Sequence, residues 1–318
     1  MPPRGKSDPG FGSGGPRYPG TFLLAFREAA RQLGWQVRQI TGHLAECRDA
    51  EQEERAVGLE NLFRRLRRAD RSNWPALIVE FLRSAASIEV DELSSTNLNE
   101  VSERLLARIG PRMEGAGAEA RVWHQPLGET GLFVNLVIDF EQGMAYVTEQ
   151  MVEESGRPGA EWLNVALANL HDRTPPDCFH MIDEDIGLRA CLIHDAYDSS
   201  RALILDELLP EAQWGCFVAV PGRDHLLILP VTADSLGTVH LLKFLAQKDY
   251  QNTPYAISDQ VYWVHDKDWH HFGIELEQDK ATVQPPPAFV EILPELLPEG
   301  KLDLLDDTDD SKPTDEPN

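Results

Sequence analysis

Paired cysteines are missing from this sequence. It holds four cysteines, and none of them stands in a C-x-x-C arrangement. Cys191 and Cys216 lie within apolar runs, where a free cysteine behaves as a small buried hydrophobic residue. This usage predicts neither a disulfide framework nor a metal site. It is typical of a reducing compartment, so we expect a cytoplasmic protein.

Long hydrophobic runs are missing as well. No apolar stretch approaches the roughly 18 residues that identify a membrane-spanning helix. Residues 1–20 are rich in glycine, proline and serine and contain no apolar signal core. We therefore expect neither a membrane span nor export, and we expect residues 1–20 to form a disordered tail.

Positive charge is scarce. The chain has 29 Lys and Arg against 53 Asp and Glu, a net charge of −24. Because contacts to phosphate need a basic face, nucleic acid and anionic membranes are not expected as partners. The one dense basic cluster comprises Arg64, Arg65, Arg67, Arg68 and Arg71. A solvated helix face is the favoured interpretation, and an anion or partner site is the alternative.

Recognisable catalytic and cofactor motifs are also lacking. The sequence has no H-E-x-x-H, no G-x-S-x-G, no G-x-x-x-x-G-K-[ST] and no kinase signature. Gly10, Gly12 and Gly15 fit G-x-G-x-x-G. No predicted strand precedes them and no helix opens on Gly15, so they do not indicate a nucleotide loop. No cofactor is predicted.

What the sequence does contain is a pattern typical of the α+β class. Residues 21–110 are expected to form a mainly helical module, with helices over 21–33, 59–66, 74–82 and 98–109 and a strand pair over 35–39 and 44–47. Residues 118–278 are expected to form a mixed, mostly antiparallel sheet with packed helices. Its predicted strands are 122–127, 132–140, 144–148, 179–183, 188–193, 216–220, 225–229, 262–265 and 269–272, and its predicted helices are 160–170, 201–209 and 235–247.

The last part of the chain is acidic. Residues 291–318 contain ten acidic and two basic side chains. We therefore expect residues 284–318 to be a disordered acidic tail that could dock on another protein.

The chain is organised around Tyr197, Asp198, Ser200 and Arg201, followed by a predicted helix, a strand that ends at Val220-Pro221 and an apolar strand. This order resembles the YtpQ-like proteins, a bacterial family with a domain of unknown function (DUF 1444). Looser matches extend over residues 22–278 and are best between 140 and 230; they include Tyr146–Met151, Trp162, Ala166–Leu170 and Pro175. Ser199 departs from the alanine typical of the family. The resemblance implies a relative and no activity.

Histidines and acids are the only material for an active site. His194, Asp195 and Asp198 are candidates for a general base or a metal site in a hydrolase. His265, His270 and His271 form a second group. The adjacent His270 and His271 should point to opposite faces of a strand, so at most one can join His265. Packing histidines are the favoured interpretation. Convergence of His194, Asp198 and either His265 or His270 in one pocket would favour the enzyme.

A noncatalytic protein- or peptide-binding module is the main functional prediction. Its candidate surfaces are the acidic tail and the aromatic hairpin that carries Trp263, His265, Trp269 and His270. With Lys267-Asp268 as the loop, His265 should face His270, and Trp263 should face Phe272. Tyr197, Asp198, Ser200 and Arg201 are further candidate binding residues.

Asp198 or Ser199 stands where a strand passes into the predicted helix. An Asp or Ser there can accept hydrogen bonds from the free amides of the first turn. Arg201 could reach back to Asp198 or hold a neighbouring carboxylate or carbonyl. We therefore expect a capped helix start, in which Asp198→Ala costs about 0.5–2 kcal/mol.

Overall fold

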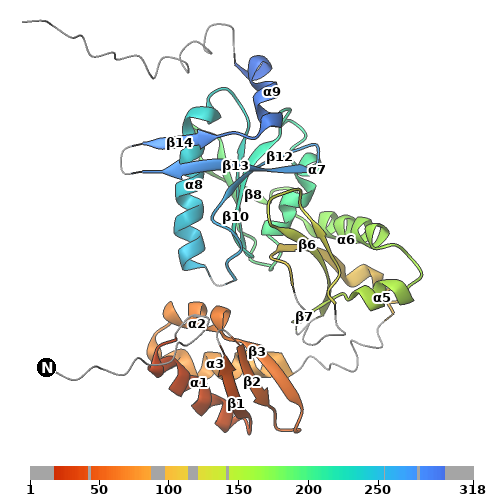
Figure 1. The fold of residues 1–318 in the computed structure, drawn as a ribbon, viewed down its shortest axis with the longest axis vertical. Coiled ribbons are helices and arrows are strands. Elements are labelled where there is room, and N and C mark those ends of the chain that lie inside the picture. Colours follow the sequence, from red (N-terminus) through yellow and green to blue (C-terminus); the bar gives the residue numbers. More distant parts are fainter. Residues whose placement is uncertain are drawn as a thin grey trace, which may run out of the picture. The chain divides into compact units, whose positions relative to one another are not determined.

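A computed structural model describes residues 18–41, 44–86, 97–113, 121–140, 143–253, 255–277 and 280–297. The chain divides into two compact units, one made of residues 1–95 and 141–143 and the other of residues 96–140 and 144–318 (Figure 1). Residues 1–17 of the tail expected over 1–20, and the acidic stretch from 298 onward, lie outside the described residues, whereas Gly20 already begins the first helix. No helix in the described ranges is long and apolar enough to cross a membrane.

The N-terminal unit packs helices against a small antiparallel sheet with strand order β1-β2-β3. Its elements are α1 (Gly20–Gln32), β1 (Gln36–Thr41), β2 (Leu44–Arg48), β3 (Glu54–Gly58), α2 (Leu59–Arg67), the 3₁₀ turn η1 (Arg71–Asn73) and α3 (Trp74–Ala86). The apolar stripes predicted for the helices form its core, with Phe22, Phe26, Leu62 and Leu82 at most 1% exposed. Gly34, at φ +78°, ends α1 as predicted. Strand β3 was not predicted, because the polar and acidic residues that lead into it obscure its alternating pattern.

The helix expected over residues 98–109 is wrong. The 3₁₀ turn η2 (Ser102–Arg104) leads into strand β4 (Leu105–Gly110), which pairs antiparallel with β6. A short apolar run does not distinguish a buried helix from a strand that is buried on both faces. Here five of the six residues of β4 are buried. These residues therefore lie in the second unit, although we expected the helical module to extend to residue 110.

The second unit contains a small sheet with order β4-β6-β5, and β7 also pairs with β6. Its further elements are β5 (His124–Pro126), β6 (Phe133–Phe140), β7 (Gly143–Tyr146), α5 (Glu149–Glu154) and α6 (Gly159–Arg173). The central position predicted for β6 is confirmed, since it has strands on both sides. Helix α6 buries one face, which includes Trp162, Ala166 and Leu170, against this sheet.

A seven-stranded sheet with order β14-β13-β12-β10-β11-β9-β8 forms the other half of this unit. Its strands are β8 (Phe179–Asp183), β9 (Leu188–Cys191), β10 (Cys216–Gly222), β11 (His225–Pro230), β12 (Val261–His265), β13 (Asp268–Leu276) and β14 (Ala281–Gln284). Neighbouring strands of this sheet pair antiparallel throughout the described residues, so the predicted α+β class is confirmed. Strand β10 is buried along its whole length, as its central position requires.

Each face of the large sheet has its own core. On one face, Val218 and Ile228 share a hydrophobic cluster with Leu136 and Ile138 of the small sheet. The other face is covered by α8 (Ser235–Asn252) and α9 (Pro287–Leu296). The predicted helix over 201–209 is a 3₁₀ helix, η3 (Ser199–Ile204), followed by the short α7 (Leu205–Leu208).

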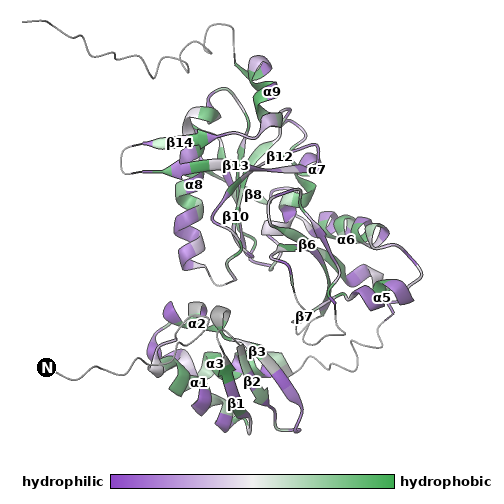
Figure 2. Ribbon diagram, viewed as in Figure 1, coloured by the Kyte–Doolittle hydropathy of each residue, from purple (hydrophilic) through white to green (hydrophobic). Residues whose placement is uncertain are grey.

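The disorder expected for residues 284–318 is wrong where the structure describes them, because residues 287–296 form helix α9. Helix α9 is largely hydrophobic (Figure 2). It buries Phe289 to 1% exposure. The Phe289 ring lies 5.0 Å from those of Phe272 and Trp263 and 5.5 Å from that of Phe217. An aromatic side chain in such a cluster contributes to the core, so the segment through Leu297 belongs to the folded unit.

The register predicted for the β12–β13 hairpin is also wrong. The loop consists of Asp266 and Lys267, both with positive φ (50° and 68°), as a type I′ turn requires. Trp263 therefore faces His270, and His265 faces Asp268. The predicted turn began one residue too late because it placed Asp268 in the loop.

Candidate functional site

Asp198 lies at the centre of the predicted site, but it does not cap a helix. Its carboxylate accepts hydrogen bonds from the amide of Ile193 at 3.1 Å and from that of His194 at 2.8 Å. Its backbone is already helical (φ −53°, ψ −50°), whereas a capping residue needs extended backbone to aim its side chain at the first-turn amides. The capping prediction is therefore wrong. Asp198 holds the preceding turn, in which His194 and Ala196 have positive φ.

Arg201, which lies in η3, joins this turn to the end of α6 and is fully buried. Its guanidinium donates to Asp198 at 3.1 Å and to both oxygens of Asp195 at 2.9 and 2.7 Å. Its Nε donates to Thr174 Oγ1 at 3.1 Å, at the end of α6. The predicted reach from Arg201 to Asp198 and to a neighbouring carboxylate is confirmed.

The ion pairs continue from the interior to the surface. Arg173, which is 40% exposed, pairs with Asp139 and lies 3.5 Å from Asp195. The buried Tyr197 hydroxyl donates to Asp139 at 3.0 Å, and burial raises the pKa of Tyr197. Each charged group of this cluster has an opposite charge beside it. Through these ion pairs and hydrogen bonds the cluster links α6, β6 and η3.

The two acids of the cluster differ in electrostatics. Burial acts to raise the pKa of Asp195, but hydrogen bonds and positive charge from Arg201 outweigh it, and the pKa lies below its ordinary value. Burial raises the pKa of Asp198 above its ordinary value, although the amides of His194 and Ile193 oppose this. The difference follows from geometry, because Arg201 is bidentate toward Asp195 and makes one bond to Asp198.

The side chains of Ser199 and Ser200 lie in the protein interior. Ser200 Oγ accepts a hydrogen bond from the Ile109 amide of β4 at 3.1 Å. Ser199 Oγ is buried and has no hydrogen-bond partner among the described residues. Both side chains are fully buried, so neither presents a hydroxyl to a ligand at the surface.

The candidate catalytic residues do not converge. His194 is exposed, and its ring lies 6.1 Å from that of His225. His265 Nε2 lies 3.3 Å from the carbonyl oxygen of Gln213, and the His270 ring stacks on Trp263. Within the described part of the chain, no group of three or more His, Cys, Asp or Glu side chains could hold a metal. The convergence that would favour a hydrolase is therefore not found.

The aromatic hairpin is not an exposed surface, which corrects the expectation. Trp263 is 2% exposed and Trp269 is 4% exposed, and they belong to the cores on opposite faces of the sheet. His265 and His270 both stack on Trp263, with ring centroids 5.4 and 5.2 Å apart. His271 lies near Tyr262 on the other face, as predicted for adjacent strand residues.

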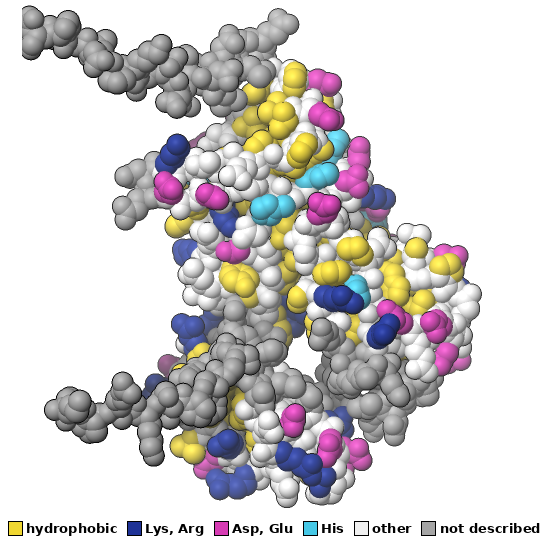
Figure 3. Space-filling view, in the orientation of Figure 1, with side chains coloured by type: hydrophobic (Ala, Val, Ile, Leu, Met, Phe, Trp, Pro, Cys, Tyr) yellow, Lys and Arg dark blue, Asp and Glu magenta, His cyan; other side chains and the backbone are white. Residues whose placement is uncertain are grey.

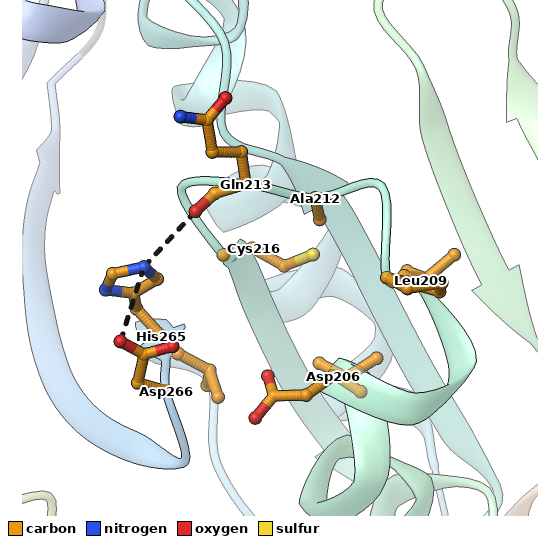
Figure 4. A pocket seen from close by; sticks show the side chains of 11 residues that line it. Asp206, Leu209, Ala212, Gln213, Cys216, His265 and Asp266 are labelled. Atoms are coloured by element: carbon orange, nitrogen blue, oxygen red, sulfur yellow. Dashed lines mark hydrogen bonds and ion pairs between the residues drawn. The ribbon is translucent and has the colours of Figure 1, made fainter.

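A small pocket lies beneath α7, beside the end of β12 (Figure 4). Its volume is about 180 Å³, and its polar lining includes Asp206, Gln213, His265 and Asp266. Figure 4 shows the sulfur of Cys216 pointing away from the His265 ring. Burial raises the pKa of Cys216 to about 12, so it is not a ready nucleophile. The volume is also below the ~300–1,000 Å³ typical of small-molecule sites.

The basic cluster is exposed, as a solvated helix face should be. Arg67, Arg68 and Arg71 are exposed, and Arg65 pairs with Glu80 at 3.1 Å. Basic side chains are visible on this unit in Figure 3. The side chain of Arg64 is outside the described set.

The surface that the sequence did not reveal is strand β8. It is the last strand of the large sheet. Its neighbouring residues Met181 and Ile182 are 47% and 51% exposed. Ile182 lies at the register irregularity between Met181 and Asp183, so two adjacent apolar side chains are exposed at this point of the edge. Two adjacent apolar residues are the signal in the sequence, but only the strand order shows that they lie at an edge.

Comparison with protein-family models, with curated proteins and with solved structures gave no match. The resemblance to the YtpQ-like proteins therefore stays a prediction, and function has to be argued from the surface of this chain.

Proposed function

We propose that this protein is a noncatalytic, cytoplasmic binding module of the YtpQ-like type that takes an extended, basic segment of another protein onto strand β8. The observation that carries the proposal is the open edge of the large sheet, with Met181 and Ile182 exposed on it. An edge strand presents a row of unpaired N–H and C=O groups, to which an extended peptide adds as a further strand.

The edge lacks the usual protection over part of its length. Phe179, His180, Met181 and Ile182 include no proline, lysine or other full charge. Soluble proteins commonly block such edges with proline, lysine or bulges. The register irregularity of β8 lies after Met181, toward Asp183. The first three residues of β8 therefore remain in regular pairing with β9 and leave a regular outer edge.

The acidic residues around β8 favour a basic partner. Asp177, Asp183, Glu184 and Asp185 are exposed along the hairpin. The nearest arginine, Arg189, is already paired with Glu211 at 3.2 Å. An incoming strand with lysine or arginine beside apolar residues matches this field, since complementary charge speeds encounter and suppresses wrong partners. A second copy of the same acidic edge would be repelled.

Fluorescence anisotropy with a labelled ten-residue peptide of alternating valine and lysine tests the proposal on the full chain. We expect saturable binding that weakens as salt is raised. The double variant Met181→Ser/Ile182→Ser should bind about tenfold more weakly or worse. Val283→Ser is the matched control, because Val283 is 39% exposed on the opposite edge strand β14, and it should leave affinity unchanged.

Three outcomes would overturn the proposal. The first is equal binding of a peptide in which glutamate replaces lysine. The second is unchanged affinity of the folded double variant. The third is self-association of the wild type that the double variant abolishes, since the occupant of the edge would then be a second copy.

A further inference from the structure

Two of the four cysteines meet beneath the start of strand β8. Cys178 directly precedes β8, and its neighbour Phe179 lies opposite Cys191 of β9. Cys178 is 2% exposed and Cys191 is fully buried, both in the core shared by the two sheets. The two thiols interact, since each shifts the pKa of the other. Both thiols therefore lie in one core, beside the first residue pair of β8 and β9.

Charged groups surround the two sulfurs. Cys191 Sγ donates to Asp198 Oδ1 at 3.4 Å. The interaction with Cys191 lowers the pKa of the Cys178 thiol, and the positive charge of Arg201 acts in the same direction against burial. The pKa of Cys191 is raised by the same interaction and by burial. The pKa of Cys178 therefore lies below its ordinary value and that of Cys191 above it, which makes Cys178 the better nucleophile of the two.

We propose that Cys178 and Cys191 form a modification site, a dithiol that a peroxide converts to an intramolecular disulfide. Transient, redox-sensing disulfides of this kind do occur in reducing compartments. The inference rests on the buried cysteine pair and is independent of the peptide site proposed on β8.

The chemistry balances in two steps. The Cys178 thiolate attacks one oxygen of hydrogen peroxide, the O–O bond breaks, and hydroxide leaves and takes up a proton to become water. The resulting Cys178 sulfenic acid is attacked by the Cys191 sulfur, whose proton passes to the Asp198 carboxylate. The S–O bond breaks, the oxygen leaves with that proton as a second water, and the S–S bond forms. Two thiols lose two electrons, and one peroxide gains them.

The position of Cys178 explains how peroxide reaches it, and the pKa values explain why the other cysteines do not react. Pro175, Pro176 and Asp177, which precede Cys178, are all exposed, so a local opening of this turn brings peroxide to the sulfur. Cys47 and Cys216 are the two cysteines outside this pair. Burial raises the pKa of Cys47 to about 11 and that of Cys216 to about 12, so both are poor nucleophiles near neutral pH.

The site can be tested on the intact protein by peptide mapping. Trypsin cleaves after Arg173, Arg189 and Arg201, which places Cys178 in residues 174–189 and Cys191 in residues 190–201. Folded protein is treated with hydrogen peroxide, free thiols are alkylated, and the digest is analysed without reductant. We expect these two peptides to be cross-linked, with loss of two hydrogen atoms, and we expect dithiothreitol to separate them.

Variants sharpen the test. Cys216→Ser should leave the cross-link unchanged. Cys191→Ser removes the second thiol and should leave Cys178 as a sulfenic acid that dimedone traps. The proposal fails if folded wild type shows no cross-link between these peptides, if the bridge includes Cys47 or Cys216, or if the cross-link forms only after denaturant is added. None of these results depends on whether the β8 edge binds a peptide.

Discussion

The turn after β2 in the N-terminal unit and the turn after β9 in the second unit share one construction. Each has a buried aspartate that accepts backbone amides of the turn and an arginine. Asp49 accepts from the Glu53 amide at 2.8 Å and from Arg55 Nε at 3.0 Å. Asp198 accepts from the amides of Ile193 and His194 and from Arg201. The second turn contains another aspartate, Asp195, which Arg201 binds through two hydrogen bonds.

That difference sets the charge of each aspartate. Burial acts to raise the pKa of Asp49, but hydrogen bonds from Arg55 and the Glu53 amide outweigh it, so the pKa is lowered. Arg201 is divided between Asp198 and Asp195, and the pKa of Asp198 is raised by burial. The hydrogen bonds of Asp49 stabilise it as the anion, whereas burial outweighs the hydrogen bonds of Asp198, whose arginine is bidentate toward Asp195.

The largest effect should come from removing the shared arginine. Arg201→Met leaves Asp195 and Asp198 without their main counter-charge, and Asp198 has no access to solvent. We expect a loss of about 3–5 kcal/mol in the free energy of unfolding, as for a broken buried ion pair. The matched change Arg55→Met should cost about 1–3 kcal/mol, because it removes the side-chain donor to the buried Asp49 carboxylate. Urea unfolding followed by circular dichroism measures both, and equal losses would contradict the comparison.

Part of this cluster could be predicted from the sequence. The approach of Arg201 to Asp198 is local, three residues apart within a predicted helix start, and it was predicted. Thr174 and Asp139 come from α6 and β6, and their approach depends on packing between distant segments. Asp195 was taken for a catalytic acid, because a sequence does not show that a neighbouring arginine saturates it.

For the fold as well, the local elements could be predicted from the sequence, whereas features that depend on distant segments could not. Alternating and 3.6-residue patterns predicted most elements, including β6, β10 and α6. They failed for β4, whose short run is apolar on both faces, and for the β12–β13 register, which a turn of two residues decides. The edge position of β8 depends on the order of seven strands, and this order is set by contacts between segments far apart in the chain.

An intermediate effect should come from the hydroxyl that completes the shell of Arg201. Thr174→Val keeps the shape of the side chain but removes the acceptor for Arg201 Nε and the donor to the Leu170 carbonyl. We expect a loss of about 1–3 kcal/mol, the cost of leaving a buried charged donor unsatisfied. Thr174→Ser retains the hydroxyl and should recover most of the stability in thermal unfolding. If Ser is as destabilised as Val, packing of the methyl group decides the effect, and the arginine does not depend on this acceptor.

The smallest and most specific effect is on the pH dependence of stability. Because the pKa of Asp49 is lower in the folded protein, its contribution to stability is present above the unfolded pKa of about 3.9 and is lost as pH falls through the folded value. Asp198 has the opposite sign. Its folded pKa is raised, so stability falls as pH rises from the unfolded pKa through the folded one. The destabilisation caused by Asp49→Asn should therefore grow as pH rises from below about 3.9. The destabilisation caused by Asp198→Asn should shrink above that pH. Urea unfolding of both variants and the wild type between acid and neutral pH distinguishes the signs, and parallel curves for the two variants would mean that sharing Arg201 does not set the charge of Asp198.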